Sequence, residues 1–299
     1  MLDYNMRVTC KKASEFAFCD ILCVSDLALC FAQCYYFKKQ TRFQIMNIAV
    51  VTGASSGFGS EFVRQLDGRG FDEIWVIARR KERLEALQSE VKTKLRPLAL
   101  DLSKTESIAE YNNELAKEKP NVSVLVNAAG FGYFNPFTKE SLELSLNMID
   151  LNDKALVSLC YDTLPYMQRG GEIYNIASTS SFQPVPYIGV YAATKSFVLS
   201  FSRSLNVELR ERGIKVIAVC PHWTKTEFFD TAVHDDSVIQ YYNFYNIQSD
   251  VVSTAISNIQ KGRDVSLCGW RIKLQVLAVK LLSHKFVMRT WCKQQNKPL

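Results

Sequence analysis

The chain has 299 residues, of which 47% are hydrophobic and 22% charged, as is ordinary for a well-packed globular protein. The formal net charge of +6 is spread along the chain, and no Lys/Arg run carries interleaved aromatic residues, so the composition argues against nucleic-acid binding. The three histidines are scattered and the nine cysteines lack zinc-like spacing, so we expect no metal site.

The first 45 residues are interpreted as an extension that precedes the fold. Residues 13–37 are apolar and have the length of a membrane span. Three carboxylates lie inside this segment, and each would cost about 2.5–3.5 kcal/mol near the bilayer centre. A peripheral amphipathic anchor, a short capping appendage and upstream sequence from a wrongly assigned start are the three interpretations left open. We favour the last, because Met46 opens directly onto a predicted strand.

A dinucleotide-binding turn is predicted just after Met46. A β-branched apolar run at 48–51 predicts a strand, and a turn containing Gly53, Gly57 and Gly59 follows it. Glycine lets backbone N–H groups approach a pyrophosphate without a Cβ clash. The amphipathic helix predicted next supplies further donors and the positive end of its dipole.

The second predicted strand lies within residues 72–87, and its end indicates which cofactor the fold would take. An acid there would accept hydrogen bonds from the ribose 2′-OH of NAD. Arg79 and Arg80 stand there instead, and the first acid is Glu82. Because a guanidinium suits a phosphate dianion, we favour NADP. The alternative is that both arginines merely begin a solvated helix.

Two more strands complete the first half of a parallel sheet. Residues 95–103 contain a strand ending near Asp101, and residues 122–132 contain one with Asn127 and Gly130 at its carboxyl end. Strands that alternate with helical stretches predict an α/β fold, a doubly wound parallel sheet of the Rossmann-like type, in a single domain. Ligands of such sheets bind at the carboxyl ends of the strands.

The candidate catalytic residues follow the fifth predicted strand, residues 171–176. Ser178 lies just past its end, and Tyr191 begins a long helical pattern in which Lys195 lies one turn further on. A free tyrosine has a pKa of about 10. We expect the ammonium of Lys195 to lower the pKa of Tyr191 into the working range, and Ser178 to orient the substrate oxygen.

In this order the motifs resemble the short-chain dehydrogenase/reductase family, from about Met46 to about Gly269. The motifs that carry the resemblance are Thr52–Gly59, Asp101, Asn127–Gly130, Asn152, Ser178, Tyr191 and Lys195. The resemblance implies a catalytic set of Ser178, Tyr191, Lys195 and Asn152, with Asn152 holding a relay water. It also implies an NADP(H) site made of Gly53, Ser55, Ser56, Phe58, Gly59, Arg79, Arg80, Asp101, Leu102, Asn127, Ala129, Tyr191, Lys195, Pro221, Thr224 and Thr226.

Two positions depart from the family pattern. His222 replaces the glycine that usually follows Pro221 in the loop against the nicotinamide. We expect its ring to point outward into solvent, and a ring that faces the substrate is the alternative. Ser56 stands where many NADP-using members carry a basic residue, so the prediction of NADP depends on Arg79 and Arg80.

The predicted substrate is a hydrophobic carbonyl or alcohol, with a steroid-like molecule as one guess, because the segments after the fourth, fifth and sixth strands are rich in aromatic residues. An alternative is that many of these rings only pack a lid against the core. The residues are Phe131, Tyr133, Phe134, Phe182, Tyr187, Trp223, Phe228, Phe229, Tyr241, Tyr242, Phe244 and Tyr245.

Residues 270–299 are predicted to form one basic amphipathic helix, because seven Lys and Arg residues occur there without an acid. Leu274, Leu277, Leu281 and Leu282 would share one face. We consider three roles for this helix: it contacts an anionic membrane surface, covers a sheet edge or forms a dimer interface.

These features together predict an NADP(H)-dependent oxidoreductase that transfers a hydride between the nicotinamide and a carbonyl/alcohol pair. Two alternatives are a non-catalytic, nucleotide-sensing protein of the same fold and a membrane-associated reductase of lipids or steroids. The cysteines form no secreted disulfide framework, so a cytoplasmic setting is expected, with membrane association as the alternative. The family resemblance implies a homodimer or a tetramer.

Overall fold

The computed structural model describes residues 45–298, except 225, 233–238 and 240–245. Four predicted pocket residues (Tyr241, Tyr242, Phe244 and Tyr245) and nearly all of the predicted N-terminal extension lie outside the described residues. The chain from Ile45 to Leu299 clusters as one compact unit, which contains the predicted catalytic domain and the C-terminal segment.

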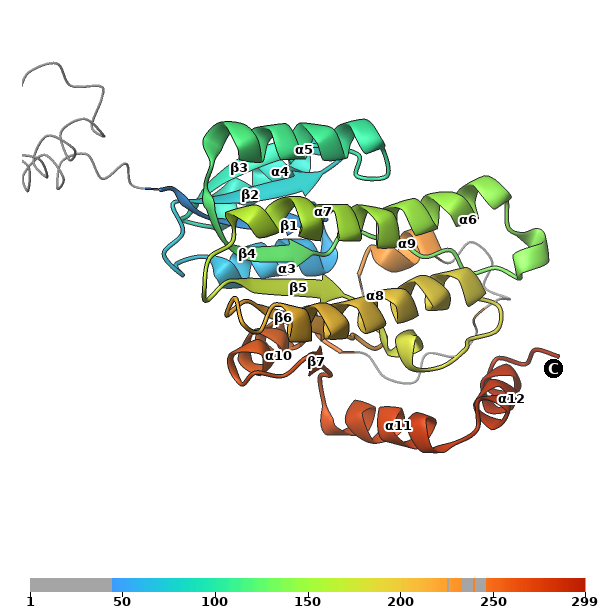
Figure 1. Ribbon diagram of the computed structural model, residues 1–299. Helices are drawn as coiled ribbons and strands as arrows, with labels where there is room; N and C mark the ends of the chain where they lie inside the picture. The colour runs from blue at the N-terminus through green and yellow to red at the C-terminus, as the bar shows by residue number, and fades with distance from the viewer. Residues whose placement is uncertain (1–44, 225, 233–238, 240–245, 299) are drawn as a thin grey trace, which may run out of the picture. The chain divides into compact units, whose positions relative to one another are not determined.

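A single seven-stranded parallel sheet forms the centre of the described unit, in the order β3-β2-β1-β4-β5-β6-β7 (Figure 1). This order winds outward from β1 in both directions, which confirms the predicted doubly wound, Rossmann-like fold. The two-residue strand β7 has no sequence signal, because two residues cannot show a periodicity. The strands are β1 (Asn47–Thr52), β2 (Glu73–Ala78), β3 (Lys94–Ala99), β4 (Asn121–Asn127), β5 (Glu172–Ile176), β6 (Lys215–Val219) and β7 (Val265–Ser266).

Helices cover both faces of the sheet. Apolar residues of α5, α7 and α8 pack on one face, and those of α3, α4 and α10 pack on the other. The α-helices are α3 (Gly57–Leu66), α4 (Lys81–Leu87), α5 (Thr105–Glu118), α6 (Leu142–Ile149), α7 (Ala155–Thr163), α8 (Gly189–Glu208), α9 (Phe228–Ala232), α10 (Gln248–Gln260), α11 (Trp270–Leu281) and α12 (His284–Gln294). The shorter helical turns are η2 (Gln88–Glu90), η3 (Phe137–Lys139), η4 (Asp150–Lys154), η5 (Leu164–Tyr166) and η6 (Thr179–Phe182).

Alternation along β1 shows why these strands form. Ile48 and Val50 point into the layer with α5, α7 and α8, while Ala49 and Val51 point into the layer with α3, α4 and α10. All four side chains are fully buried, which explains the unbroken apolar run: a strand covered on both faces has no polar side. Each buried Ile or Val contributes about 1.5–3 kcal/mol by leaving water.

The C-terminal segment differs from its prediction, because residues 270–299 form two helices instead of one. Leu282 adopts an extended backbone conformation after α11 ends at Leu281. Ser283 then caps α12, its hydroxyl accepting a hydrogen bond from the amide of Phe286. A serine that satisfies a free backbone N–H favours starting a new helix at this point. Within the described residues, no helix has the length and apolar character needed to cross a membrane.

Candidate active site

The glycine turn between β1 and α3 has the close packing that a phosphate cradle requires. Gly53 has a φ of 66°, and a Cβ atom there would lie 2.7 Å from the backbone of Ala128. A Cβ at Gly59 would lie 2.5 Å from the carbonyl carbon of Gly53. Both positions therefore exclude any larger residue, and the turn leaves the N-terminus of α3 open to a ligand.

Two arginines follow β2 beside this turn. Arg79 is exposed and lines a cavity of about 1060 Å³, whose wall also contains Gly53 of this turn. Arg80 reaches across to the turn and donates to the hydroxyls of Ser55 and Ser56, at 3.1 Å each. Arg80 also forms a 3.0 Å ion pair with Glu227, which likewise pairs with Arg83 at 2.6 Å. Glu227 comes from the loop after β6, and no signal in the sequence predicts its contact with the arginines.

The ends of β1, β4 and β5 are braced by hydrogen bonds behind the cavity. The hydroxyl of Thr52 accepts from the amides of Ala128 and Ala129, both at 3.0 Å. The side chain of Asn127 is buried and donates to Asn175 at 2.8 Å. Asn127 therefore supports the site from within the core, and its side chain does not line the cavity.

Asn152 lies on η4, a π-helical segment inserted between α6 and α7. Its Nδ2 donates to the carbonyl of Phe131 at 2.9 Å and to Thr194 at 3.1 Å, and its Oδ1 accepts from the amide of Phe131 at 3.0 Å. The side chain thus holds the loop after β4 against α8. Asn152 lies behind the cavity wall, close to Lys195, since a Cβ added at Gly130 would meet both side chains.

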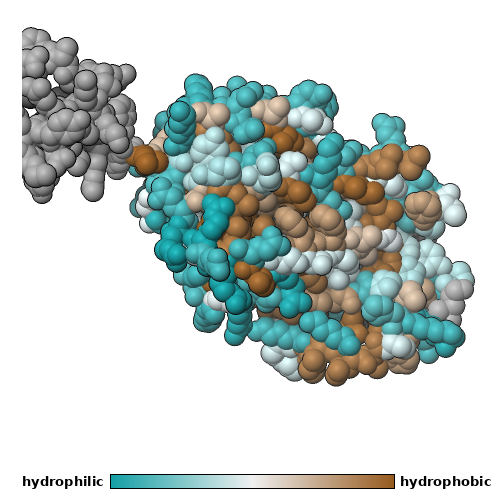
Figure 2. Space-filling model, viewed as in Figure 1, coloured by the Kyte–Doolittle hydropathy of each residue, from teal (hydrophilic) through white to brown (hydrophobic). Residues whose placement is uncertain are grey.

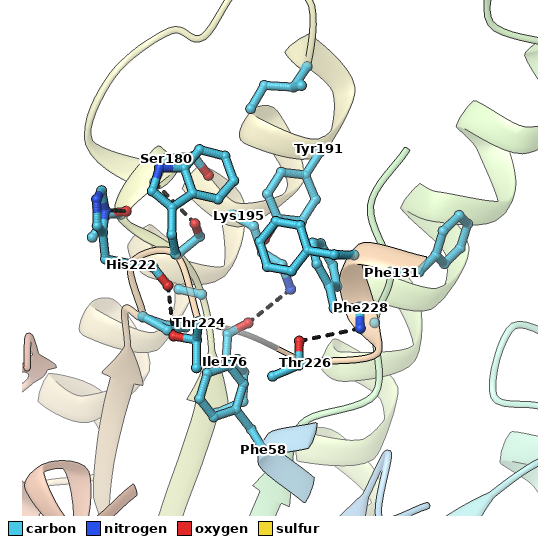
Figure 3. A pocket seen from close by; sticks show the side chains of 18 of the residues that line it. Phe58, Phe131, Ile176, Ser180, Tyr191, Lys195, His222, Thr224, Thr226 and Phe228 are labelled. Carbon is cyan, nitrogen blue, oxygen red and sulfur yellow. Dashed lines mark hydrogen bonds between the residues drawn. The ribbon is translucent and has the colours of Figure 1, made fainter. Parts of the chain in front are cut away.

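Ser178, Tyr191 and Lys195 line the same cavity just past the carboxyl end of β5. Figure 3 shows Tyr191 and Lys195 in this cavity. The hydroxyl of Ser178 lies near enough to the Tyr191 phenol to lower its pKa. The ammonium of Lys195 donates to the carbonyl of Ile176 at 3.0 Å and lies 5.8 Å from the ring centroid of Tyr191. Helix α8 brings Tyr191 and Lys195 to one face, as their four-residue spacing predicts.

The pKa of Tyr191 differs from the sequence prediction. Burial raises it to about 12, and the hydrogen bond to Ser178 opposes this rise only in part. Burial also lowers the pKa of Lys195 to about 8, while the nearby charge of Asp153 acts in the opposite direction. The pKa of Tyr191 is therefore raised where the sequence predicts a lowering, because loss of hydration penalises the tyrosinate more than the neighbouring side chains stabilise it.

Asp153, next to Asn152 on η4, is a titratable group that the sequence analysis missed. Burial raises its pKa to about 7, and the positive charge of Lys195 partly offsets this rise. One of its carboxylate oxygens is inaccessible to solvent and has no hydrogen-bond partner among the described residues. A carboxyl group beside the lysine of the site thus changes charge near neutral pH.

His222 lies inside the site, which corrects the expectation that its ring points into solvent. Its Nδ1 is 3.0 Å from the hydroxyl of Thr179, and its Nε2 is inaccessible to solvent. Burial lowers the pKa of His222 to about 4, so the ring is neutral at pH 7. The contact joins the loops after β5 and β6, which are also linked by the amide of Thr179 and the carbonyl of Pro221 at 3.0 Å.

The loop after β6 continues along the cavity through Thr224 and Thr226. Thr224 is buried and donates to the carbonyl of His222 at 2.9 Å, while Thr226 accepts from the amide of Phe228 at 3.3 Å. All the predicted site residues line one cavity except Gly59, Asn127 and Asn152, which support its wall from behind. The lining predicted residues are Gly53, Ser55, Ser56, Phe58, Arg79, Arg80, Asp101, Leu102, Ala129, Ser178, Tyr191, Lys195, Pro221, Thr224 and Thr226.

The cavity has a volume of about 1060 Å³ and is rich in aromatic rings at the Tyr191 end. The ring of Tyr191 lies 5.5 Å from both Phe134 and Phe228, centroid to centroid. Phe131, Phe182, Trp223 and Phe229 also line it, as predicted, whereas Tyr133 and Tyr187 do not. Trp270, Phe286 and Trp291 of α11 and α12 contribute to the wall, which the sequence analysis missed by treating them as a tail.

The family model described as "short chain dehydrogenase" matches residues 47–237 of the chain. Among curated proteins, the chain is 37% identical over 177 residues to "NADP-dependent 3-hydroxy acid dehydrogenase YdfG" of Escherichia coli O6:H1. That match covers 58% of this chain and 71% of the relative. The chain is also 32% identical over 181 residues to an uncharacterized oxidoreductase of Staphylococcus epidermidis. This match covers 60% of this chain and 78% of that protein.

Solved structures give the same picture. A short-chain dehydrogenase from Sphingobium yanoikuyae in complex with NADPH superposes with a TM-score of 0.69 at 28% identity. The superposition covers 82% of this chain and 96% of the chain of that dehydrogenase. The closed form of a serine dehydrogenase complexed with NADP+ superposes with a TM-score of 0.62 at 32% identity, covering 71% and 88% of the two chains.

Proposed function

The chain belongs to the short chain dehydrogenase family of oxidoreductases, and from this premise we propose that it is an NADP(H)-dependent carbonyl reductase. Its reaction would transfer a hydride between the nicotinamide and a hydrophobic carbonyl or alcohol. The single observation that carries the proposal is the meeting of Tyr191, Ser178 and Lys195 on the wall of one large cavity.

The residues of the cavity fit an NADP(H) molecule. Gly53 and Gly59 leave no room for a Cβ, as a turn that approaches a pyrophosphate requires. Arg79 and Arg80 would hold the 2′-phosphate, which would replace Glu227 as the anionic partner of Arg80. The bound cofactor would supply or accept the hydride. NADP-dependent relatives and NADP(H)-bound structures favour the same choice.

Tyr191 would serve as the proton donor when a carbonyl is reduced. With a pKa of about 12, its phenol keeps its proton at neutral pH and can give it to the oxygen that becomes an alcohol. Ser178 would hydrogen-bond the same oxygen, because its side chain lines the cavity near the phenol of Tyr191. The ammonium of Lys195 would stabilise the tyrosinate left behind. Asn152 would hold the loop after β4 and support the relay of protons to solvent.

The substrate class follows from the walls of the cavity. Phe134 and Phe228 pack against Tyr191, and Trp223 packs against Phe134. These rings favour a bulky apolar molecule. The alternative of a nucleotide-sensing protein gives no reason for a buried phenol and a buried lysine to line the cavity together with a serine. Cys160, Cys220, Cys268 and Cys292, the cysteines of the described residues, are all free, which supports a reducing, cytoplasmic setting.

Replacement of Tyr191 by Phe tests the proposal. We expect NADPH oxidation with a panel of hydrophobic ketones to fall by about 10²–10⁴-fold in this variant, because the proton donor is lost. NADPH binding, followed by fluorescence titration, should stay within about twofold of the wild type, since the phenol touches the reacting oxygen. The control is Tyr161→Phe, which removes the hydroxyl of an exposed tyrosine on α7. Ketone reduction that survives in Tyr191→Phe would refute the role of Tyr191.

A further inference from the structure

Helix α11 carries two apolar stripes on opposite sides. Ile272 and Val276 are buried against the rest of the protein. Trp270, Leu274, Leu277 and Leu281 follow each other at intervals of four, three and four residues, so they form a second stripe. Rotation by about 100° per residue puts this second stripe about 150° from the buried one.

The outer stripe is exposed along its full length. The exposed fractions are 69% for Trp270, 58% for Leu274, 52% for Leu277 and 78% for Leu281. Figure 2 shows apolar side chains gathered along the lower edge of the molecule, where Figure 1 draws α11. Single exposed leucines are normal, but four large apolar residues in a row on one helix indicate a binding surface.

Basic side chains flank the outer stripe. Lys273 and Lys280 lie on one side of it and Arg271 on the other, and all three residues are exposed. The last acidic residue of the chain is Asp264, so no acid lies on α11 or α12, while four more basic residues follow Lys280. An apolar stripe bordered by lysine and arginine is the pattern of a helix that lies in the headgroup region of an anionic bilayer.

The mouth of the cavity lies beside this stripe. Two members of the outer stripe, Trp270 and Leu274, line the cavity, and so do Arg271, Gln275 and Ala278 on the flank of α11 next to this stripe. The helix is held there by Lys280, whose ammonium lies 5.0 Å from the ring centroid of Phe182. A surface that binds the outer stripe would therefore lie next to the opening of the cavity.

Helix α12 closes the other side of this mouth. Its Trp291 donates from the indole N–H to the carbonyl of Pro186 at 3.0 Å. The hydroxyl of Tyr187 donates to the carbonyl of Pro298 at 2.9 Å. Both contacts fix the end of the chain to the loop after η6, so that α11 and α12 are part of the rim of the cavity.

We propose that the outer stripe of α11 docks on the surface of an anionic lipid bilayer. The helix has 12 residues and is about 18 Å long, too short to cross a bilayer, so it would lie flat in the interface. A second copy of the chain fits the surface less well, because two-fold contact between identical α11 faces would bring lysine and arginine together with no acid to pair with them. On the proposed function, the apolar substrate would then enter the cavity from the membrane.

Co-sedimentation of the full chain with vesicles tests this docking without any need for catalysis. The wild type should bind vesicles of phosphatidylcholine with phosphatidylglycerol at least about tenfold more tightly than pure phosphatidylcholine vesicles, because each Lys or Arg near an anionic surface adds about 1 kcal/mol. The double variant Leu277→Glu/Leu281→Glu should lose at least about tenfold of this binding. The matched control is Leu142→Glu/Leu146→Glu, two exposed leucines of α6 at the same spacing, which should bind as the wild type does.

Two further readouts distinguish docking on lipid from self-association and from a loss of catalysis. Binding should shift the fluorescence of Trp270 to shorter wavelength, and Trp270→Phe should abolish this shift. Leu277 and Leu281 do not line the cavity, so reduction of a soluble ketone should be unchanged in their double variant, and a lost activity would concern the proposed function instead. The inference is overturned if the wild type does not bind anionic vesicles or if the double variant still binds them fully. It is also overturned if gel filtration shows that the double variant changes only self-association.

Discussion

Replacement of His222 by Gln should change how the stability of the protein depends on pH. The imidazole joins the loops after β5 and β6 through its contact with Thr179. Burial lowers its pKa, and no charged group in the described part of the chain contributes to this shift. Burial alone therefore explains the shift, and removal of the titrating group should remove the effect. Glutamine keeps a polar side chain that can bond Thr179 but takes up no proton.

The size of the effect follows from the two pKa values. His222 titrates at 6.5 in the unfolded chain and at about 4 in the folded protein. Between these values the unfolded state binds more protons, so the free energy of unfolding is intact above pH 6.5 and falls as the pH drops toward 4. At pH 4.5 the loss amounts to about 2.5 kcal/mol, a large fraction of the 5–15 kcal/mol typical of a folded domain.

Urea denaturation at pH 7 and pH 4.5 measures this loss, with the change in the wild type compared to the change in His222→Gln. The variant should lose about 2.5 kcal/mol less than the wild type between the two pH values. The control His284→Gln removes an exposed histidine at the start of α12 and should behave as the wild type does. Equal losses in the wild type and His222→Gln would refute the argument that burial holds this ring neutral.

Three further predictions concern the cofactor turn, the arginines beside it and the loop after β4. Gly59→Ala should abolish NADPH binding and destabilise the protein by about 1–3 kcal/mol, because the new Cβ would meet the backbone of Gly53. In the control Gly189→Ala, the new Cβ meets no atom, so the melting temperature should stay unchanged or rise. In calorimetric titrations, the double variant Arg79→Gln/Arg80→Gln should bind NADPH about 10–100-fold more weakly, while NADH binding should change much less. Equal losses for both cofactors would contradict a 2′-phosphate site. Asn152→Ala should lower the free energy of unfolding by about 2–3 kcal/mol in urea titrations, since the backbone of Phe131 loses two partners, and an unchanged midpoint would count against that bracing role.

Local patterns were enough to predict the fold and most of the cavity wall. The apolar run of β1 and its glycine turn specify a strand followed by a helix wherever they occur, because they depend on neighbouring residues alone. The four-residue spacing of Tyr191 and Lys195 likewise places both side chains on one face of α8. The carboxyl ends of parallel strands meet at one edge of the sheet, so the sequence also predicts that Ser178 lies near Tyr191 and Lys195.

Contacts between distant parts of the chain could not be predicted in this way. Glu227 meets Arg80 across 147 residues of sequence, and the C-terminal tail returns to build the rim of the cavity with Trp270 and Trp291. Neither position carries a periodic pattern that points to its partner. The break between α11 and α12 was missed as well, because the basic and apolar pattern resumes directly after it. Ser283, a residue type that favours a helix start, was the one local signal of the break.

The sequence by itself determined which groups this protein has for its chemistry and which secondary structures carry them. Only the tertiary structure decided how those groups ionise: the phenol of Tyr191 keeps its proton far above neutral pH, and the ring of His222 stays neutral. The physical reason is that a pKa depends on hydration, and a side chain loses its water only when segments far apart in the sequence close around it.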